Sequence, residues 1–222
     1  MDVVIVDYDS GNLRSVEKAL QAVGAPAVVT RDPARVADAA AIVLPGQGAF
    51  PDCMRKLEAF GLARVVRDRI LAGVPFLGIC LGYQLLFDET EEHGGCTGLG
   101  ILRGRVVRFP HPADGAPARL KVPHMGWNRI RKRAPTPVLR GVEDGAWVYF
   151  VHSFYPVPED PGVVATVTEY GVTFASSVAR GNLYACQFHP EKSQRVGLAL
   201  LRGFWENVRA AAPRPSSAPP GF

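Results

Sequence analysis

Residues 75–87, PFLGICLGYQLLF, place one cysteine between two glycines in an otherwise apolar run. The order Gly78-Ile79-Cys80-Leu81-Gly82 has the glycine-x-nucleophile-x-glycine pattern of a nucleophile elbow, where a strand ends, the chain turns sharply and a helix begins. Small residues are needed there because backbone segments approach closely. The pattern predicts a strand over residues 75–79 and a helix over residues 83–87. A cysteine that merely fills the core remains the alternative for Cys80, and five residues do not decide between the two.

Short β-branched runs and amphipathic segments alternate on both sides of this stretch. Residues 3–6, VVIV, form a continuous apolar run, which is typical of a parallel strand covered on both faces. The alternation predicts strands over residues 27–29 and 41–44, and helices over residues 13–23, 33–39 and 60–72. Strands that alternate with helices imply βαβ units with right-handed crossovers and a parallel sheet.

The second half of the sequence is richer in strands. We expect them over residues 104–109, 119–122, 147–151, 163–168, 174–179 and 183–188, followed by a helix over residues 193–210. No linker separates the halves, so residues 1–210 are predicted to form one mixed α/β domain. Residues 211–222 are rich in proline, serine and alanine and are predicted to be a disordered tail.

Composition excludes several classes of function. The formal net charge of +4 is modest, and the basic run over residues 129–133 lacks aromatic residues for base stacking, so nucleic-acid binding is not expected. No signal peptide is visible, and no apolar run reaches the roughly 18 residues of a membrane span. The four scattered cysteines argue against a disulfide framework or a cysteine zinc site. A cytoplasmic protein without a membrane association is therefore expected.

A second motif lies far downstream, at Gln187-Phe188-His189-Pro190-Glu191-Lys192-Ser193. Proline disfavours helical geometry at the residue before it, so His189 is predicted to be extended at the end of a strand. Glu191 is placed to accept a hydrogen bond from the imidazole. Thiol, imidazole and carboxylate together suit covalent acyl transfer. A surface ion pair before a helix is the alternative, and the presence of both motifs favours the triad.

The segment Pro45-Gly46-Gln47-Gly48 follows a buried strand. Such loops gather at the carboxyl ends of parallel strands, where ligands bind. Glycines there allow backbone N–H groups to approach a substrate and stabilise an oxyanion. An ordinary turn is the alternative, and this motif alone favours that simpler reading.

These motifs resemble those of a known family. GICLGYQ over residues 78–84 and FHPEKS over residues 188–193 are similar to the nucleophile and histidine–glutamate motifs of class I (triad) glutamine amidotransferases. DYDSGN at 7–12, LPGQGAF at 44–50, HMGWN at 124–128 and YFVHSF at 149–154 resemble the subfamily of glutaminase subunits of imidazole glycerol phosphate synthases. The resemblance covers the chain from its first residue to about residue 208.

The resemblance implies a flavodoxin-like α/β domain with a central, mostly parallel sheet, flanking helices and additional antiparallel strands. It implies hydrolysis of glutamine to glutamate and ammonia without a metal or organic cofactor. The ammonia would pass to a cyclase subunit with a (β/α)8 barrel fold, within a heterodimer. That partner makes imidazole glycerol phosphate and aminoimidazole carboxamide ribotide in histidine biosynthesis.

The resemblance also implies residue roles. Cys80 is the expected nucleophile, His189 the acid and base, and Glu191 the group that orients His189. Phe154 stands where tyrosine is common, so its substrate contact is expected through the backbone. The remaining expected sites are the oxyanion residues Gly46, Gln47, Gly48 and Leu81, the substrate-binding residues Gln84, Glu92, Ser153 and Phe154, and the partner or ammonia-path residues Asn12, Tyr149 and Lys192.

Three alternatives remain open from the sequence. The first is a glutaminase that serves another acceptor pathway, the second is a different hydrolase with a nucleophile elbow, and the third is a binding subunit without catalytic activity. The HMGWN and PGQG segments disfavour the first, and the adjacent His-x-Glu placement disfavours the second. The intact triad disfavours the third. We also expect very low activity without the cyclase, because ammonia released without an acceptor is wasted.

Overall fold

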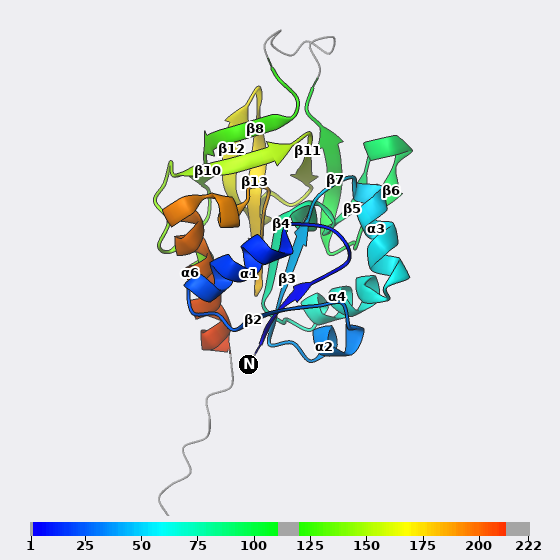
Figure 1. Ribbon diagram of the computed structural model, residues 1–222. Helices are drawn as coiled ribbons and strands as arrows, with labels where there is room; N and C mark the ends of the chain where they lie inside the picture. The colour runs from blue at the N-terminus through cyan, green and yellow to red at the C-terminus, as the bar shows by residue number, and fades with distance from the viewer. Residues whose placement is uncertain (1, 111–119, 212–222) are drawn as a thin grey trace, which may run out of the picture.

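The computed structural model describes residues 2–110 and 120–211, and within them eight strands form the central sheet, in the order β2-β1-β3-β4-β14-β13-β12-β9 (Figure 1). The parallel part comprises β2 (Ala27–Thr30), β1 (Val3–Val6), β3 (Ala41–Gly46), β4 (Phe76–Cys80) and β14 (Leu183–Cys186). The antiparallel part comprises β13 (Val172–Arg180), β12 (Val164–Tyr170) and β9 (Arg131–Lys132). The carboxyl ends of β3, β4 and β14 therefore lie side by side.

Helices cover both faces of the parallel strands (Figure 1). Val3 and Ile5 point to the face covered by α1 (Leu13–Ala22) and α6 (Gln194–Ala211), whereas Val4 and Val6 point to the face covered by α2 (Pro33–Ala37), α3 (Phe50–Ala59) and α4 (Leu62–Leu71). Alternate residues of a strand face opposite sides, so a strand with two covered faces is apolar throughout. Each fully buried large aliphatic or aromatic side chain contributes about 1.5–3 kcal/mol to folding.

Smaller sheets extend the molecule beyond the carboxyl ends of these strands. One has the order β11 (Phe154–Pro158), β7 (Leu102–Arg108), β5 (Phe87–Thr90) and β6 (Cys96–Thr97). The other pairs β8 (His124–Arg129) with β10 (Trp147–His152) in antiparallel register. Short helices α5 (Leu81–Gln84), η1 (Glu92–Gly94), η3 (Pro137–Leu139), η4 (Pro161–Val163) and η5 (Pro190–Lys192) connect the strands. The predicted fold class is confirmed.

Some predicted elements differ from the structure. The helix expected over residues 83–87 is instead the shorter α5, and Phe87 already begins β5. The strand expected over residues 119–122 is wrong for residues 120–122, because pairing with β10 begins only at His124. The elements α3, β5, β6, β8, β9 and β11 were not predicted from the sequence patterns.

Two further predictions concern the ends and the exterior of the domain. The predicted tail lies outside the described residues except for Ala211, the last residue of α6. The boundary at residue 210 stays a prediction. No helix in the described part of the chain is both long enough and apolar enough to cross a bilayer.

Candidate active site

Cys80 is held in a strained backbone conformation at the carboxyl end of β4. Its φ is 54° and its ψ is −109°, a combination that non-glycine residues rarely adopt and that costs about 1–3 kcal/mol. The chain then enters α5 directly. A Cβ atom on Gly82 would overlap the carbonyl oxygen of Leu44, and one on Gly78 would lie 2.8 Å from the carbonyl oxygen of Gly82. Gly82 is therefore required for the elbow to pack against β3, and Gly78 for the turn itself to close.

His189 and Glu191 form a buried pair beside this elbow. His189 Nδ1 lies 2.7 Å from Glu191 Oε1, and the two side chains are 3 % and 2 % exposed. His189 Nε2, the opposite ring nitrogen, has no protein hydrogen-bond partner. Burial lowers the pKa of His189, but the electrostatic influence of the neighbouring Cys80 and Glu191 outweighs it and raises that pKa to about 10. The imidazole is therefore held ready to carry a proton beside the sulfur.

The backbone around His189 is fixed by one buried serine. His189 N–H donates to the Tyr149 carbonyl at 2.9 Å. Ser193 Oγ donates to the His189 carbonyl at 2.7 Å and accepts from Tyr149 N–H at 3.0 Å. His189 has φ −100° and ψ 98°, the extended geometry predicted from Pro190.

A cavity of about 420 Å³ joins the elbow to the histidine. Leu81, the first residue of α5, lies in its wall, and the first N–H groups of a helix have no partner within the helix. Glu191 stands behind His189, outside the lining. The lining residues are Gln47, Gly48, Cys80, Leu81, Gln84, Glu92, Pro123, Val151, His152, Ser153, Phe154, His189 and Lys192.

The sequence that builds this site matches that of a known group of enzymes. The family model for glutamine amidotransferase class-I matches residues 4–207. The chain belongs to this family. The family and the fold predicted from the elbow and the His-Pro-Glu motif are confirmed.

Individual relatives agree with the family model. The chain is 55 % identical over 202 residues to the imidazole glycerol phosphate synthase subunit HisH of Syntrophotalea carbinolica, covering 91 % of this chain and 98 % of that protein. It is 54 % identical over 209 residues to the protein of the same name from Aromatoleum aromaticum, covering 91 % and 97 %. A solved structure of a glutamine amidotransferase from Thermotoga maritima is 16 % identical, with a TM-score of 0.63 over 94 % of this chain and 97 % of that one. That likeness shows the fold alone.

The glycine loop of this amidotransferase is held by side chains from elsewhere. Gln47 N–H donates to Ser10 Oγ at 3.0 Å, and the Gln47 carbonyl oxygen lies 2.6 Å from the same hydroxyl. Cys53 Sγ lies 3.2 Å from Ser10 Oγ and 3.4 Å from the Gln47 carbonyl oxygen. Gly48 has φ +102°. The N–H of Gln47 is thus occupied in this conformation, although the loop lines the cavity.

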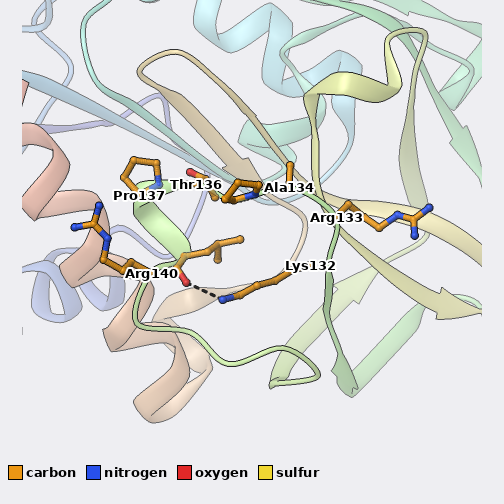
Figure 2. Close-up of a pocket in the computed structure, with 8 residues that line it drawn as sticks. Lys132, Arg133, Ala134, Thr136, Pro137 and Arg140 are labelled. Carbon is orange, nitrogen blue, oxygen red and sulfur yellow. Dashed lines mark hydrogen bonds between the residues drawn. The ribbon is translucent and has the colours of Figure 1, made fainter.

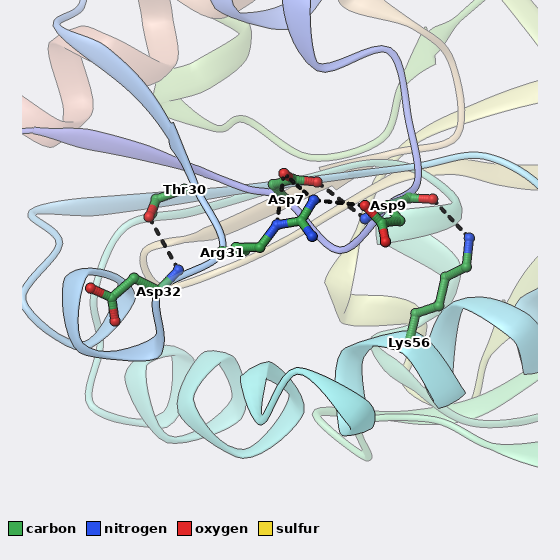
Figure 3. A network of polar contacts seen from close by, with 6 residues as sticks. All are labelled: Asp7, Asp9, Thr30, Arg31, Asp32 and Lys56. Carbon is green, nitrogen blue, oxygen red and sulfur yellow. Dashed lines mark hydrogen bonds and ion pairs between the residues drawn. The ribbon is translucent and has the colours of Figure 1, made fainter.

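The segment that carries Ser10 is fixed by ion pairs (Figure 3). Arg31 Nη2 lies 2.8 Å from Asp7 Oδ2 and 2.7 Å from Asp9 Oδ1. Lys56 Nζ donates to the Asp9 carbonyl at 2.8 Å, and Asp9 has φ 57°. Burial raises the pKa of Asp7, but the hydrogen bonds from Arg31 and the Asp9 N–H lower it overall. Lys56 from α3 and Arg31, which directly follows β2, thereby anchor the turn after β1.

One wall of the cavity is a line of amide hydrogen bonds. Gln84 Nε2 donates to the Phe154 carbonyl at 2.9 Å and to Gln187 Oε1 at 3.0 Å. Gln187 Nε2 in turn lies 3.7 Å from Cys80 Sγ. No role was predicted for Gln187, although it directly precedes the Phe-His-Pro-Glu motif. Its contact with the Cys80 sulfur places the Gln187 side chain directly beside the cavity.

Two expected substrate residues have structural partners. The Phe154 carbonyl accepts from His152 Nδ1 at 2.8 Å as well as from Gln84, so both lone pairs of the oxygen are used. The backbone contact expected at Phe154 is therefore left to its N–H. Glu92 Oε2 accepts from Phe50 N–H at 2.8 Å, at the start of α3. Glu92 is nonetheless one of the residues that line the cavity.

Of the three expected partner-path residues, Lys192 lines the cavity, whereas Tyr149 and Asn12 are not in its lining. Lys192 Nζ lies 5.8 Å from the centroid of the Tyr149 ring, and Trp127 meets that ring edge-on at 6.1 Å. Trp127 is 45 % exposed. Asn12 caps α1 by accepting from Ser15 N–H at 3.4 Å and does not line the cavity.

A second cavity, of about 510 Å³, contains no comparable chemistry (Figure 2). Lys132 Nζ donates a hydrogen bond to the Leu139 carbonyl at 3.1 Å, and the side chains of Arg133 and Arg140 extend in opposite directions. In the described part of the chain no group of three or more His, Cys, Asp or Glu side chains is placed to hold a metal ion.

Proposed function

We propose that this amidotransferase is the glutaminase subunit of an imidazole glycerol phosphate synthase. It hydrolyses glutamine to glutamate and ammonia, and the ammonia is used by a cyclase subunit in histidine biosynthesis. The observation that supports the chemistry best is a single cavity holding Cys80 at a strained elbow, the His189 ring and the start of α5. The names of the relatives at 54–55 % identity support the pathway.

In the first half of the reaction, the Cys80 thiolate attacks the γ-carboxamide carbon of glutamine. The negative charge that develops on the carboxamide oxygen is stabilised by the Leu81 N–H and by an N–H of the loop that contains Gly46, Gln47 and Gly48. His189 gives its proton to the departing nitrogen, which leaves as ammonia. A thioester between Cys80 and the glutamyl group remains.

In the second half, neutral His189 takes a proton from water, and the hydroxide attacks the thioester carbon. The carbon–sulfur bond breaks, glutamate leaves, and the thiolate is restored beside protonated His189. Glu191 keeps the ring oriented through the bond to Nδ1 in both halves. No cofactor is needed for either half.

The charged ends of glutamine require polar partners, because an unpaired charge in a cavity is costly. Glu92, Gln84, Ser153 and the Phe154 N–H are proposed to supply them. Glu92 suits the α-ammonium group by its charge.

The glycine loop is proposed to limit activity in the isolated subunit. The Gln47 N–H donates to Ser10 and is not free for an oxyanion in this conformation. The loop must therefore reorient before Gln47 can take part. We expect the cyclase to favour that change from the side of Asn12, Tyr149 and Lys192, in a cytoplasmic heterodimer.

The deciding experiment measures glutamate release from glutamine by the purified chain. It is run with the chain by itself, with a cyclase subunit of imidazole glycerol phosphate synthase, and with that cyclase plus its nucleotide substrate. We expect very low release from the isolated chain and strong stimulation by the pair. Glutamate release that is the same with and without the cyclase would assign the chain to another acceptor pathway. No glutamate release under any condition would favour a binding subunit without activity.

A further inference from the structure

Two buried histidines and an asparagine form a continuous hydrogen-bonded line that ends at the cavity wall. Asn128 Nδ2 lies 3.2 Å from His124 Nε2, and His124 Nδ1 lies 3.0 Å from His152 Nε2. His152 Nδ1 lies 2.8 Å from the Phe154 carbonyl oxygen. The rings are 2 % and 6 % exposed. Proposed glutamine hydrolysis does not use any of these three side chains directly.

The partners fix the direction of every bond in the line. A carbonyl oxygen only accepts, so His152 Nδ1 carries hydrogen and its Nε2 accepts when the ring is neutral. His124 Nδ1 must then donate, and its Nε2 accepts from Asn128. The second amide hydrogen of Asn128 goes to the Glu169 carbonyl at 2.9 Å, while its oxygen accepts from Arg129 N–H at 2.7 Å. Each donor in the line therefore meets one acceptor.

Both rings must be neutral for this line to exist, since a proton on either would set two N–H groups against each other. Burial lowers the pKa of His124 to about 4 and that of His152 to about 3. Aromatic packing fixes the rings as well. His124 lies between Tyr170, at 3.9 Å and 20°, and Phe150, at 4.7 Å and 22° between ring centroids and planes.

The far end of the line meets the substrate wall. The Phe154 carbonyl that accepts a hydrogen bond from His152 Nδ1 also accepts one from Gln84 Nε2, and Gln84 lines the cavity. Gln84 continues to Gln187, which contacts Cys80 Sγ. His124 and Asn128 do not line the cavity themselves. Their connection to substrate is therefore indirect.

We propose that Asn128, His124 and His152 are positioning residues, a directional hydrogen-bond relay that fixes the Phe154 carbonyl and through it the Gln84 amide against which glutamine binds. This inference rests on the proposed glutaminase function. A relay of this kind orients a binding group and does not move protons during the reaction. Its loss is therefore expected to weaken substrate binding more than turnover.

The test substitutes His124, which lies outside the cavity. His124→Phe keeps a flat ring between Tyr170 and Phe150 but removes both nitrogens. His124→Gln restores one donor and one acceptor. Tyr170→Phe is the matched control, because it removes a hydroxyl from the same cluster that donates to the Lys121 carbonyl, outside the relay. Asn128→Ala probes the partly exposed outer end and serves if His124→Phe does not fold.

With the cyclase and its nucleotide substrate present, we expect His124→Phe to raise KM for glutamine about 3–10-fold with kcat within about twofold. Partial recovery is expected in His124→Gln, a smaller rise in Asn128→Ala, and no change in Tyr170→Phe. An unchanged KM in both His124→Phe and Asn128→Ala, or an equal change in Tyr170→Phe, overturns the relay.

Nuclear magnetic resonance of the isolated wild-type chain separates this inference from the proposed function. Both imidazoles are expected as neutral Nδ1–H tautomers at pH 7, and the Gln84 side-chain amide hydrogens are expected to exchange slowly with water. Faster Gln84 exchange in His124→Phe supports the relay even if the chain hydrolyses no glutamine. Another tautomer of His152, a charged ring at pH 7, or unaltered Gln84 exchange overturns it.

Discussion

Cys80 shows how much of the site is decided at one residue. Its backbone is held at φ 54° and ψ −109° by the close contact between the elbow and β3. The same conformation turns the sulfur out of the strand and into the cavity wall. Backbone strain of this kind persists only where the surrounding structure enforces it. The elbow therefore exchanges some stability for the direction in which the sulfur points.

This leads to a prediction about two substitutions at one position. Cys80→Ala and Cys80→Gly both remove the sulfur, and both are expected to lower cyclase-stimulated glutamate release at least about 10⁴-fold. Glycine relieves the backbone strain that alanine retains, so the Gly variant should be more stable than the Ala variant by about 1 kcal/mol. Urea denaturation measures the difference.

Cys96→Ala is the matched control, because this free cysteine lies in β6, away from the cavity. It should retain full activity. Glutamate release that persists in Cys80→Ala would contradict the proposal that Cys80 is the nucleophile. A Gly variant less stable than the Ala variant would show that the elbow is not strained.

At this scale, the residues predictable from the sequence are those whose chemistry constrains their neighbours. Cys80 needs glycines beside it, and His189 and Glu191 lie two positions apart. Gln187 was missed because its partner Cys80 lies 107 residues away, and nothing near Gln187 indicates that contact. Ser10 was missed for the same reason, since the Gln47 it binds lies 37 positions along the chain.

At the scale of elements, the His189 turn depends on η5 lying against β10. Ser193 Oγ joins the two, since it bonds both the His189 carbonyl and the Tyr149 N–H. Ser193 is 1 % exposed, so water does not replace it. The position of the imidazole is thus set by an element distant in sequence.

Ser193→Ala is therefore expected to destabilise the protein by about 1–3 kcal/mol, because a buried N–H and a buried carbonyl lose their partner. Glutamate release should fall as well, since His189 is no longer held at its working position. Thermal unfolding and initial rates measure the two effects. Ser15→Ala, in half-buried α1, should alter neither. Wild-type activity in Ser193→Ala would mean that the proline alone fixes the turn.

The elements themselves were predictable where local pattern and long-range pairing agree. The strand over residues 3–6 was predicted with its observed bounds, because its apolar run fits a strand covered on both faces. The run after Cys80 was assigned to a helix as far as Phe87, but Phe87 pairs with Leu102 in β7. A short apolar run suits either structure, so the distant partner decides.

At the scale of the whole molecule, the site needs both halves of the chain. The parallel strands bring Cys80 beside the segment that leads to His189, because β4 pairs with β14. The wall over residues 151–154 comes from the end of β10 and the start of β11. The placement of a late strand next to β4 has no local signature in the sequence, and for this reason the cavity was not predictable as a whole.

The buried histidine pair makes the stability of the whole protein depend on pH. Its rings have pKa values lowered to about 4 and about 3, against 6.5 when unfolded. The unfolded chain therefore binds protons first as pH falls, so stability is present above about pH 6.5 and is lost toward the folded pKa values. The pKa of His189 is raised instead, so this ring is protonated in both the folded and the unfolded chain below pH 6.5. Its contribution to stability is lost only as the pH rises from 6.5 toward 10.

The free energy of unfolding should accordingly fall by about 4 kcal/mol between pH 6.5 and pH 4.5, since each proton taken up contributes about 1.4 kcal/mol per pH unit. Denaturant titrations at several pH values measure it. His124→Phe removes one of the two groups and should roughly halve the slope, whereas Tyr170→Phe should keep it. A slope that is unchanged in His124→Phe would mean that His124 does not contribute to the pH dependence of stability, which would contradict this prediction.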